Sequence, residues 1–172
     1  IDGLVERKGL AGGGQGENLA AADKRSYASR EGTATVQSVP LIASAIMAKE
    51  LAWGTDAMGL DVKTGSGAFM RTGDEGFMLG REMVSIGTSL GKSVTALVTD
   101  MNQPRGNAIG NALAVREALA TPRGEHDGSA FYDIFVPLAA HLLLVAGLAR
   151  DQKDWFPTVA AAHKAGAALA NS

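Results

Sequence analysis

The stretch AMGLDVKTGSGAFMRTGDEGFMLGREMVSIGTSLGKSVTALVTD, residues 57–100, decides the fold of this chain. It opens with a short apolar run at residues 57–63 and closes with another at 94–100. Apolar runs of this length, bounded by turn residues, favour buried strands. Residues 74–90 carry apolar side chains at helical spacing and end before Gly91, so they predict a helix. A strand, a helix and a second strand in this order are typical of a parallel βαβ unit.

The residues on either side continue the alternation of helices and strands. A helix is expected to open at Ser38, which can cap it, with Pro40 tolerated in its first turn. It should run to about Trp53, and Gly54 is a stop signal. The remaining expectations are a glycine-rich loop at residues 9–24 and helices at 111–120, 129–149 and 151–170. This order indicates an α/β fold with a mainly parallel sheet flanked by helices and ending in a helical segment.

The length of 172 residues favours a single α/β domain or a fragment of a larger protein. We divide the chain into a glycine-rich leading segment at residues 1–26, an α/β core at 27–120 and a helical segment at 125–172. The first residue is Ile1 rather than Met, so we expect a clipped or partial product.

Charge and composition exclude several classes of partner. The 16 Lys and Arg residues nearly balance the 18 Asp and Glu residues, and no basic patch stands out, so nucleic acid is not expected as a partner. The absence of Cys excludes disulfides and thiol catalysis, and it fits a reducing, cytoplasmic location. The longest apolar run, FVPLAAHLLLVAGLA at residues 135–149, is shorter than the roughly 20 residues that span a bilayer. We interpret it as a buried helix and expect no membrane contact.

Two glycine motifs could bind phosphate or form turns. GTSLGKS, residues 87–93, resembles a P-loop, but its glycines are too close together and it runs from helix to strand, so we interpret it as a helix C-terminus. KTGSGAFM, residues 63–70, follows a strand, and its Gly65 and Gly67 suit either close approach to a ligand or a plain turn. Ligands of such sheets bind beyond the carboxyl ends of the strands, here residues 63–70 and 99–108.

The histidines show no metal-binding or catalytic pattern. His126, His141 and His163 are far apart, and none has a partner at metal-ligand spacing. His141 lies in an apolar run and is interpreted as a packed or hydrogen-bonded core residue. Asp61 and Asp100 lie on or at the ends of strands, where hydrogen bonding at the strand end accounts for both.

SREGTATVQSVPLIASAIMAK, residues 29–49, places two cations beside an apolar helix. Four residues follow helical spacing and share one face: Ile42, Ala45, Ile46 and Lys49. Lys49 is either a solvated lysine whose stem covers this face or an ammonium at the rim of an apolar pocket. In the second interpretation, Arg30 can reach the same pocket.

Two segments resemble the central part of the pyrimidine and thymidine phosphorylases. They are DKRSYASREGTATVQSVPLIASAIMAKELAWGTDAMGLDVKTGSGAFM, residues 23–70, and VTALVTDMNQPRGNAIGNALAVREAL, residues 94–119. The resemblance implies reversible phosphorolysis of a pyrimidine nucleoside to free base and (deoxy)ribose 1-phosphate. It also implies a small helical lobe and a large α/β lobe that close over the substrates, in a homodimer.

The resemblance assigns roles to residues in three places: before the helix that begins at Ser38, within that helix, and in the loop after the first predicted strand. It implies that Tyr27, Arg30 and Lys49 bind the base, with Arg30 and Lys49 polarising it in catalysis. The apolar wall of the base pocket falls on Val36, Ile42, Ile46, Phe69 and Met70. Ala45 stands where the family commonly has a serine that bonds to the base. One base contact is therefore missing or rearranged, because the adjacent Ser44 would face about 100° away on a helix.

The resemblance implies inorganic phosphate as co-substrate, no organic cofactor and, in some members, a potassium ion. The ion would bind the side chain of Glu117 and the backbone carbonyls of Arg105 and Ala108. The alternative for Glu117 is an ordinary carboxylate on a helix surface.

Departures from the family pattern keep two other functions open. Ser29, Glu31 and Gly32 differ from the residues that usually surround the key arginine, and the phosphate-binding motif with its Lys-His-Ser start and catalytic histidine is absent from this sequence. The chain therefore resembles the base-binding half of a site. One alternative is a non-catalytic fragment serving as scaffold or oligomerisation module, and the other is a related phosphoribosyltransferase.

Overall fold

The computed structural model describes residues 6–7, 19–121, 130, 132–149, 151, 155 and 157–161. Its centre is a two-stranded parallel sheet of β1 (Ala57–Thr64) and β2 (Ser93–Asp100), paired in register from Ala57 with Ser93 to Thr64 with Asp100. The α4 helix (Gly73–Ser89) connects the two strands. The expected α/β fold with strands near 57–63 and 94–100 and a helix near 74–90 is confirmed.

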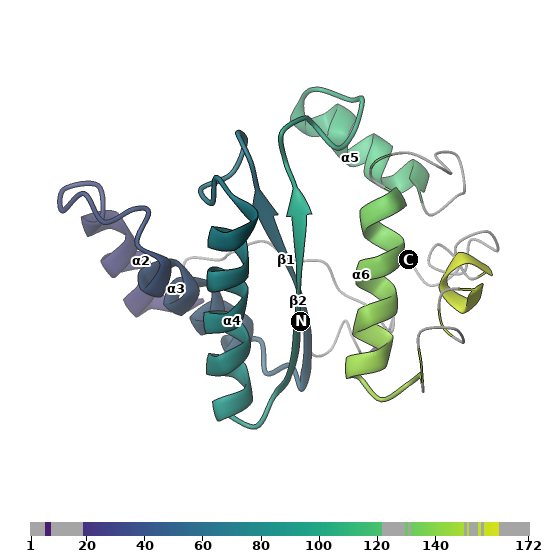
Figure 1. Ribbon diagram of the computed structural model, residues 1–172, viewed down its shortest axis with the longest axis horizontal. Coiled ribbons are helices and arrows are strands. Elements are labelled where there is room, and N and C mark those ends of the chain that lie inside the picture. Colours follow the sequence, from purple (N-terminus) through teal and green to yellow (C-terminus); the bar gives the residue numbers. More distant parts are fainter. Residues whose placement is uncertain are drawn as a thin grey trace.

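Helices cover both faces of the sheet. Figure 1 shows α4 on one side and α6 (Tyr132–Val145) on the other, with α3 (Val39–Ala52) and α2 (Ala21–Ser29) beyond α4. The α4 helix approaches the sheet through glycines. A Cβ atom on Gly76 would clash with Thr64, and one on Gly87 would clash with Val94. Because these two residues lack side chains, α4 can pack closely against β1 and β2.

The main core lies between α3, α4 and β1. Its fully or nearly buried members are Ala43, Met47, Met58, Leu60, Val62, Met70, Leu79 and Met83. Unbranched methionines fill irregular gaps between a helix pair and a strand. A second cluster joins α6 to Trp155 and Val159, and here His141 stacks obliquely on Trp155 with ring centroids 5.5 Å apart. His141 is therefore packed against Trp155, as interpreted, but it is half-buried and does not belong to the buried core.

Two local expectations near the N-terminus are corrected. Residues 21–24, predicted as loop, belong to α2. No residue of α2 is fully buried and Ala20 before it adopts a left-handed φ of 51°, so neither an apolar period nor a capping side chain marks this helix. The α3 helix begins after Ser38 as expected, but the Ser38 hydroxyl makes no capping hydrogen bond. Residues 9–18 lie outside the described part.

The helix ends follow the glycine signals. Gly54 after α3 has a φ of +75°, and Gly91 after α4 has a φ of +74°. The GTSLGKS segment is thus the C-terminus of α4, as interpreted. The α5 helix (Asn111–Ala120) has the expected bounds. Trp155 and residues 157–161 are helical within the expected 151–170 segment, whose other residues are outside the described part except Asp151. Among the described residues, no helix is long and apolar enough to cross a bilayer.

Candidate active site

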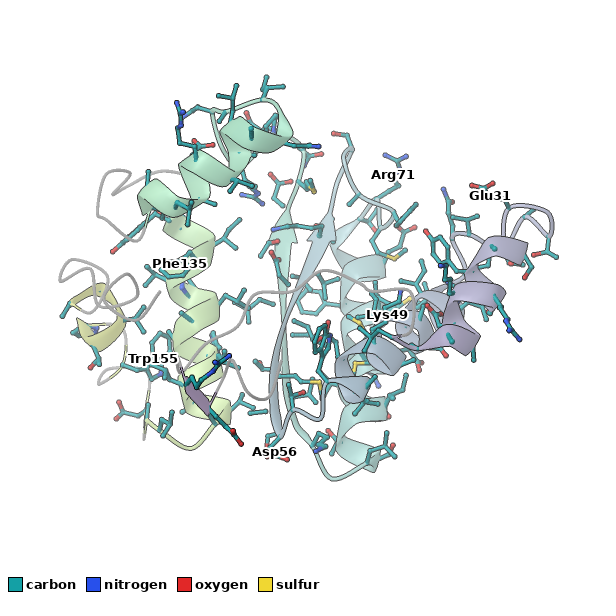
Figure 2. The ribbon with its side chains drawn as sticks, turned by 180° about the vertical axis from the view of Figure 1, so that it is seen from behind. Glu31, Lys49, Asp56, Arg71, Phe135 and Trp155 are labelled. Carbon is teal, nitrogen blue, oxygen red and sulfur yellow. The ribbon has the colours of Figure 1, made fainter. Side chains whose placement is uncertain are left out.

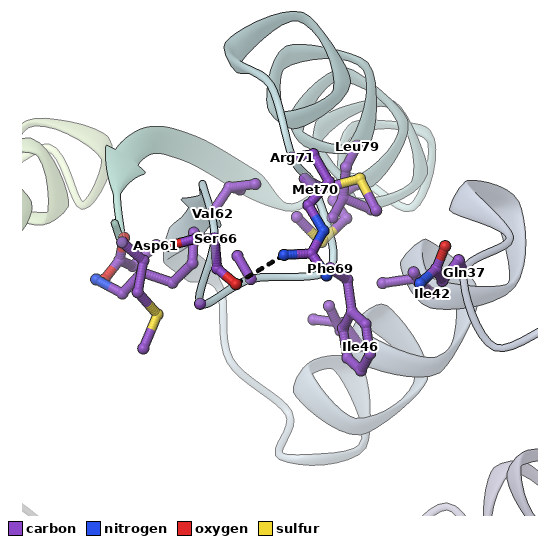
Figure 3. A pocket seen from close by; sticks show the side chains of 15 residues that line it. Gln37, Ile42, Ile46, Asp61, Val62, Ser66, Phe69, Met70, Arg71 and Leu79 are labelled. Carbon is purple, nitrogen blue, oxygen red and sulfur yellow. Dashed lines mark hydrogen bonds and ion pairs between the residues drawn. The ribbon is translucent and has the colours of Figure 1, made fainter. Parts of the chain in front are cut away.

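A cavity of about 540 Å³ opens beside the carboxyl half of β1. Figure 3 shows Ile42 and Ile46 of α3 on one side and Phe69 and Met70, from the loop after β1, on another. Met70 is buried and Phe69 is about half exposed, at 54%. Four of the five residues predicted as an apolar wall therefore line one cavity.

The loop after β1 is held against the loop after β2. The Ser66 N–H donates to Asn102 Oδ1 (3.0 Å), and the Gly67 N–H donates to the Met101 carbonyl oxygen (3.0 Å). A Cβ atom on Gly65, whose φ is +115°, would lie 2.7 Å from Asn102 Oδ1. The glycines of KTGSGAFM thus serve a close approach between two strand-end loops. Arg71 reaches back across the same loop and donates to the Ser66 carbonyl oxygen (2.7 Å; Figure 3).

Polar side chains of both strands form a small network at one side of the cavity. Lys63 donates to Asp61 and to Thr99 Oγ1 (3.2 Å), and Thr99 Oγ1 donates to Asp61 Oδ1 (2.6 Å). Asp100 accepts from the N–H and the side chain of Asn102. Hydrogen bonding at a strand end accounts for Asp100, as interpreted, whereas Asp61 lies inside β1 and is held by Lys63 and Thr99.

Arg30 and Lys49 converge on one carboxylate. Arg30 Nη2 lies 3.5 Å from Asp23 Oδ1, and Lys49 Nζ lies 3.1 Å from Asp23 Oδ2, an ion pair without the alignment of a hydrogen bond. Both cations also face the Tyr27 ring, at 5.1 Å for Arg30 and 5.7 Å for Lys49. Lys49 lies where α3 meets α2 (Figure 2). Neither cation is a solvated end, because both belong to this group of Asp23, Tyr27, Arg30 and Lys49, called the cation cluster below.

Arg30 is the most buried charged residue of the cluster, with 3% of its surface exposed. Its Nε and Nη1 atoms are buried and have no hydrogen-bond partner within the described part of the chain. Such donors are costly to bury unless something accepts from them. Neither atom is accessible in this structure, so an acceptor could reach them only after a local movement of the site.

The cation cluster adjoins the cavity through α3. Ile46 lines the cavity, and Lys49 follows one helical turn later, about 5 Å along the axis. The cluster residues Tyr27, Arg30 and Lys49 do not themselves line the cavity. Ala45, which is buried in α3 at 3% exposure, and Val36, which is half-buried in the α2–α3 connection, do not line it either.

A smaller cavity of about 200 Å³ is lined by Arg105, Ala108 and Glu117, the residues predicted to hold a monovalent cation. The Glu117 carboxylate accepts the N–H groups of Asn107 (2.8 Å) and Ala108 (3.0 Å). Buried Nε and Nη2 atoms of Arg105 bring positive charge to the same loop. These residues fit a cation only in part. The Glu117 carboxylate could bind one, but it already accepts hydrogen bonds from two N–H groups of the loop.

Within the described residues, no group of three His, Asp or Glu side chains has the arrangement of a metal site. His126 and His163 lie outside the described residues, so the structure gives them no environment.

The family model described as glycosyl transferase family, a/b domain, matches residues 1–169. The chain belongs to this family. Three curated relatives of this glycosyl transferase a/b domain are named pyrimidine-nucleoside phosphorylase. They come from Geobacillus stearothermophilus (45% identical), Staphylococcus epidermidis (45%) and Staphylococcus aureus (43%). Each match covers 96% of this chain and 38% of the relative, so the chain spans well under half the length of these proteins.

Sequence reasoning missed Asp23 in this glycosyl transferase a/b domain. Its side chain is only 7% exposed and contacts both predicted base-binding cations. Asp23 stands seven residues before Arg30 in a segment with no apolar period, and it was predicted to lie in a loop. No local pattern pairs it with either cation, because Arg30 is beyond the i+3 and i+4 spacing of a helix and Lys49 belongs to α3.

Proposed function

We propose that this chain supplies the base-binding half of the active site of a pyrimidine-nucleoside phosphorylase. The reaction would split a pyrimidine (deoxy)nucleoside with phosphate into free base and (deoxy)ribose 1-phosphate. The convergence of Arg30 and Lys49 beside Tyr27 carries this proposal, together with the cavity that Ile46 lines one helical turn before Lys49. The names of the sequence relatives support it.

The chemistry explains why two cations are useful here. A phosphate oxygen forms a bond to the anomeric carbon while the bond from that carbon to a ring nitrogen breaks. The base leaves with the electron pair and gains a proton afterwards. Donors aimed at its carbonyl oxygens stabilise this negative charge more in the transition state than in the substrate. A single such donor contributes about 3 kcal/mol.

Arg30 and Lys49 suit different parts of this task. The Arg30 guanidinium offers a planar set of donors, of which Nε and Nη1 have no partner in the described part of the chain. Lys49 is a point charge, and 22% of its side chain is exposed. Ile42, Ile46 and Met70 would exclude water from the base, which strengthens both electrostatic interactions. Tyr27 and Phe69 would contact the ring through their faces or edges.

We extend the proposal from the resemblance to a cytoplasmic homodimer and to a potassium ion at Glu117 with the carbonyls of Arg105 and Ala108. No catalytic step is assigned to that ion. Dependence of phosphorolysis on potassium, with tetramethylammonium as the comparison cation, tests it. We assign no residue of this chain to phosphate.

A scaffold without catalysis is the second candidate, and Ala45 in place of the base-bonding serine favours it. The phosphoribosyltransferase alternative predicts turnover of a ribose pyrophosphate donor instead.

Calorimetric titration with thymine and uracil, together with phosphorolysis of thymidine and uridine, tests the main proposal. The wild-type chain should bind the bases, and Arg30→Gln or the less buried Lys49→Gln should weaken binding by about tenfold or more. Lys92→Gln is the matched control, because Lys92 pairs with Asp56 (3.0 Å) at the amino end of the sheet. Phosphate-dependent release of base would extend the proposal to full catalysis. A folded wild-type chain that binds neither base would contradict it and favour the scaffold.

A further inference from the structure

Asp23 is the one acidic member of the cation cluster, and neither the sequence motif nor the proposed chemistry has given it a role. It belongs to α2, whereas Arg30 caps the end of that helix and Lys49 belongs to α3. Its two carboxylate oxygens contact different cations, Oδ1 at 3.5 Å from Arg30 and Oδ2 at 3.1 Å from Lys49. One side chain thus connects the two helices that carry the predicted base-binding groups.

Burial makes this contact energetically demanding. The side chains of Asp23 and Arg30 are 7% and 4% exposed. A buried charge is tolerated when it is paired, and removing one partner leaves the other uncompensated. Asp23 therefore holds Arg30 in place, and the two cations hold Asp23.

Asp23 contacts only one of the three guanidinium nitrogens of Arg30. Asp23 engages the Nη2 atom, while Nε and Nη1 are buried without a partner in the described part of the chain. A carboxylate that formed two parallel hydrogen bonds with the guanidinium would occupy two of its three nitrogens and compete with a ligand for them. Asp23 instead contacts the guanidinium through one nitrogen and leaves Nε and Nη1 without a partner in the described part of the chain.

Asp23 also sets the charge of the cluster. Arg30 and Lys49 both lie near the Tyr27 ring. Without a carboxylate between them, they would be two neighbouring positive charges. Like charges at this range repel, and Lys49, the more exposed of the two, would move away. With Asp23 present, one net positive charge remains to balance one negative charge on a leaving base.

We propose that Asp23 is a positioning residue that holds Arg30 and Lys49 at the geometry needed for an uncharged pyrimidine base and limits the attraction of the site for an anionic one. This rests on the proposed function of the cation cluster. It predicts that loss of the Asp23 charge changes which base binds better, in addition to how tightly bases bind.

The test compares uracil with 5-nitrouracil, an analogue whose ring N–H ionises near neutral pH, by calorimetry on the 172-residue chain above that pH. In Asp23→Asn, uracil affinity should fall about tenfold, because the cations lose their geometry. Affinity for ionised 5-nitrouracil should fall less or be unchanged, because a like charge has been removed. The ratio of the two affinities should then rise, by up to about tenfold, in favour of the anion.

Two further variants keep the test decisive. Asp56→Asn removes a carboxylate that is also paired with a lysine but is 98% exposed, and it should leave both affinities unchanged. Asp23→Glu keeps the charge on a longer side chain, so it should weaken uracil binding while the ratio stays near that of the wild type. Circular dichroism establishes that each variant is folded. If Asp23→Asn does not fold, uracil binding by Asp23→Glu still tests the positioning role of Asp23.

The outcomes separate the two proposals. A wild-type chain that binds neither base overturns the proposed function and this inference with it. A wild-type chain that binds uracil, with Asp23→Asn lowering both affinities in parallel or neither, overturns only the inference. Undisturbed uracil binding in Asp23→Glu would likewise show that the position of the carboxylate is unimportant.

Discussion

Single atoms decide the geometry of the loop after β1. Gly65 combines a left-handed φ of +115° with a Cβ position only 2.7 Å from Asn102, and the added Cβ on Gly67 would lie 2.8 Å from the Met101 carbonyl oxygen. The two strand-end loops therefore meet only because these residues lack side chains. Phe69 and Met70 leave this loop toward the cavity, so its shape also sets the position of the predicted base pocket.

Gly65→Ala should lower the free energy of unfolding by about 1–3 kcal/mol, because the alanine meets both backbone strain and a clash. Gly73→Ala is the control, since nothing lies within 4 Å of its Cβ position and its φ is not left-handed. It should be neutral or stabilise the chain by up to about 1 kcal/mol. Urea unfolding followed by tryptophan fluorescence measures both, and equal effects of the two substitutions would contradict this account.

At the scale of elements, helix ends differ in what holds them. The α4 helix has a full capping box, in which Thr72 Oγ1 accepts the Glu75 N–H (3.2 Å) and Glu75 accepts the Thr72 N–H (3.2 Å). The α3 helix has a serine in the corresponding position with no such bond. Both sequences carry a residue that can cap, and only one uses it.

Thr72→Ala should destabilise the chain by about 1 kcal/mol, because α4 loses the partner of a backbone N–H. Ser38→Ala should cost only a few tenths of that amount, since the hydroxyl caps nothing in α3. Thermal unfolding by circular dichroism ranks the two. A larger loss for Ser38→Ala would show that the cap of α3 forms in solution.

For the whole molecule, the main hydrophobic core that stabilises the fold also forms part of the wall of the candidate site. Met47, at 1% exposure, packs between α3 and α4, and Met70 belongs both to this core and to the cavity wall. Protein interiors are close-packed, so a change in this core is felt at the neighbouring cavity.

Met47→Ala should lower the free energy of unfolding by about 2–5 kcal/mol, because it removes buried surface and leaves a void. Met78→Ala on the exposed face of α4, where Met78 is 59% exposed, should change it by less than about 0.5 kcal/mol. Denaturant unfolding measures the difference. Comparable losses in the two variants would mean that the core is not located between α3 and α4.

The sequence predicts β1, β2, α3, α4 and α5 to within a residue or two, because each has a local apolar pattern with a glycine at or near a boundary. It also brought Ile42, Ile46 and Lys49 to one face through helical spacing. The tertiary structure alone decided α2, the unused cap at Ser38 and the contact of Gly65 with Asn102. It alone placed Asp23 between Arg30 and Lys49. The physical reason is that periodicity records which face of an element is buried. The partner of a buried charge and the clearance of a glycine depend on segments that are distant in the chain and meet only in the folded molecule.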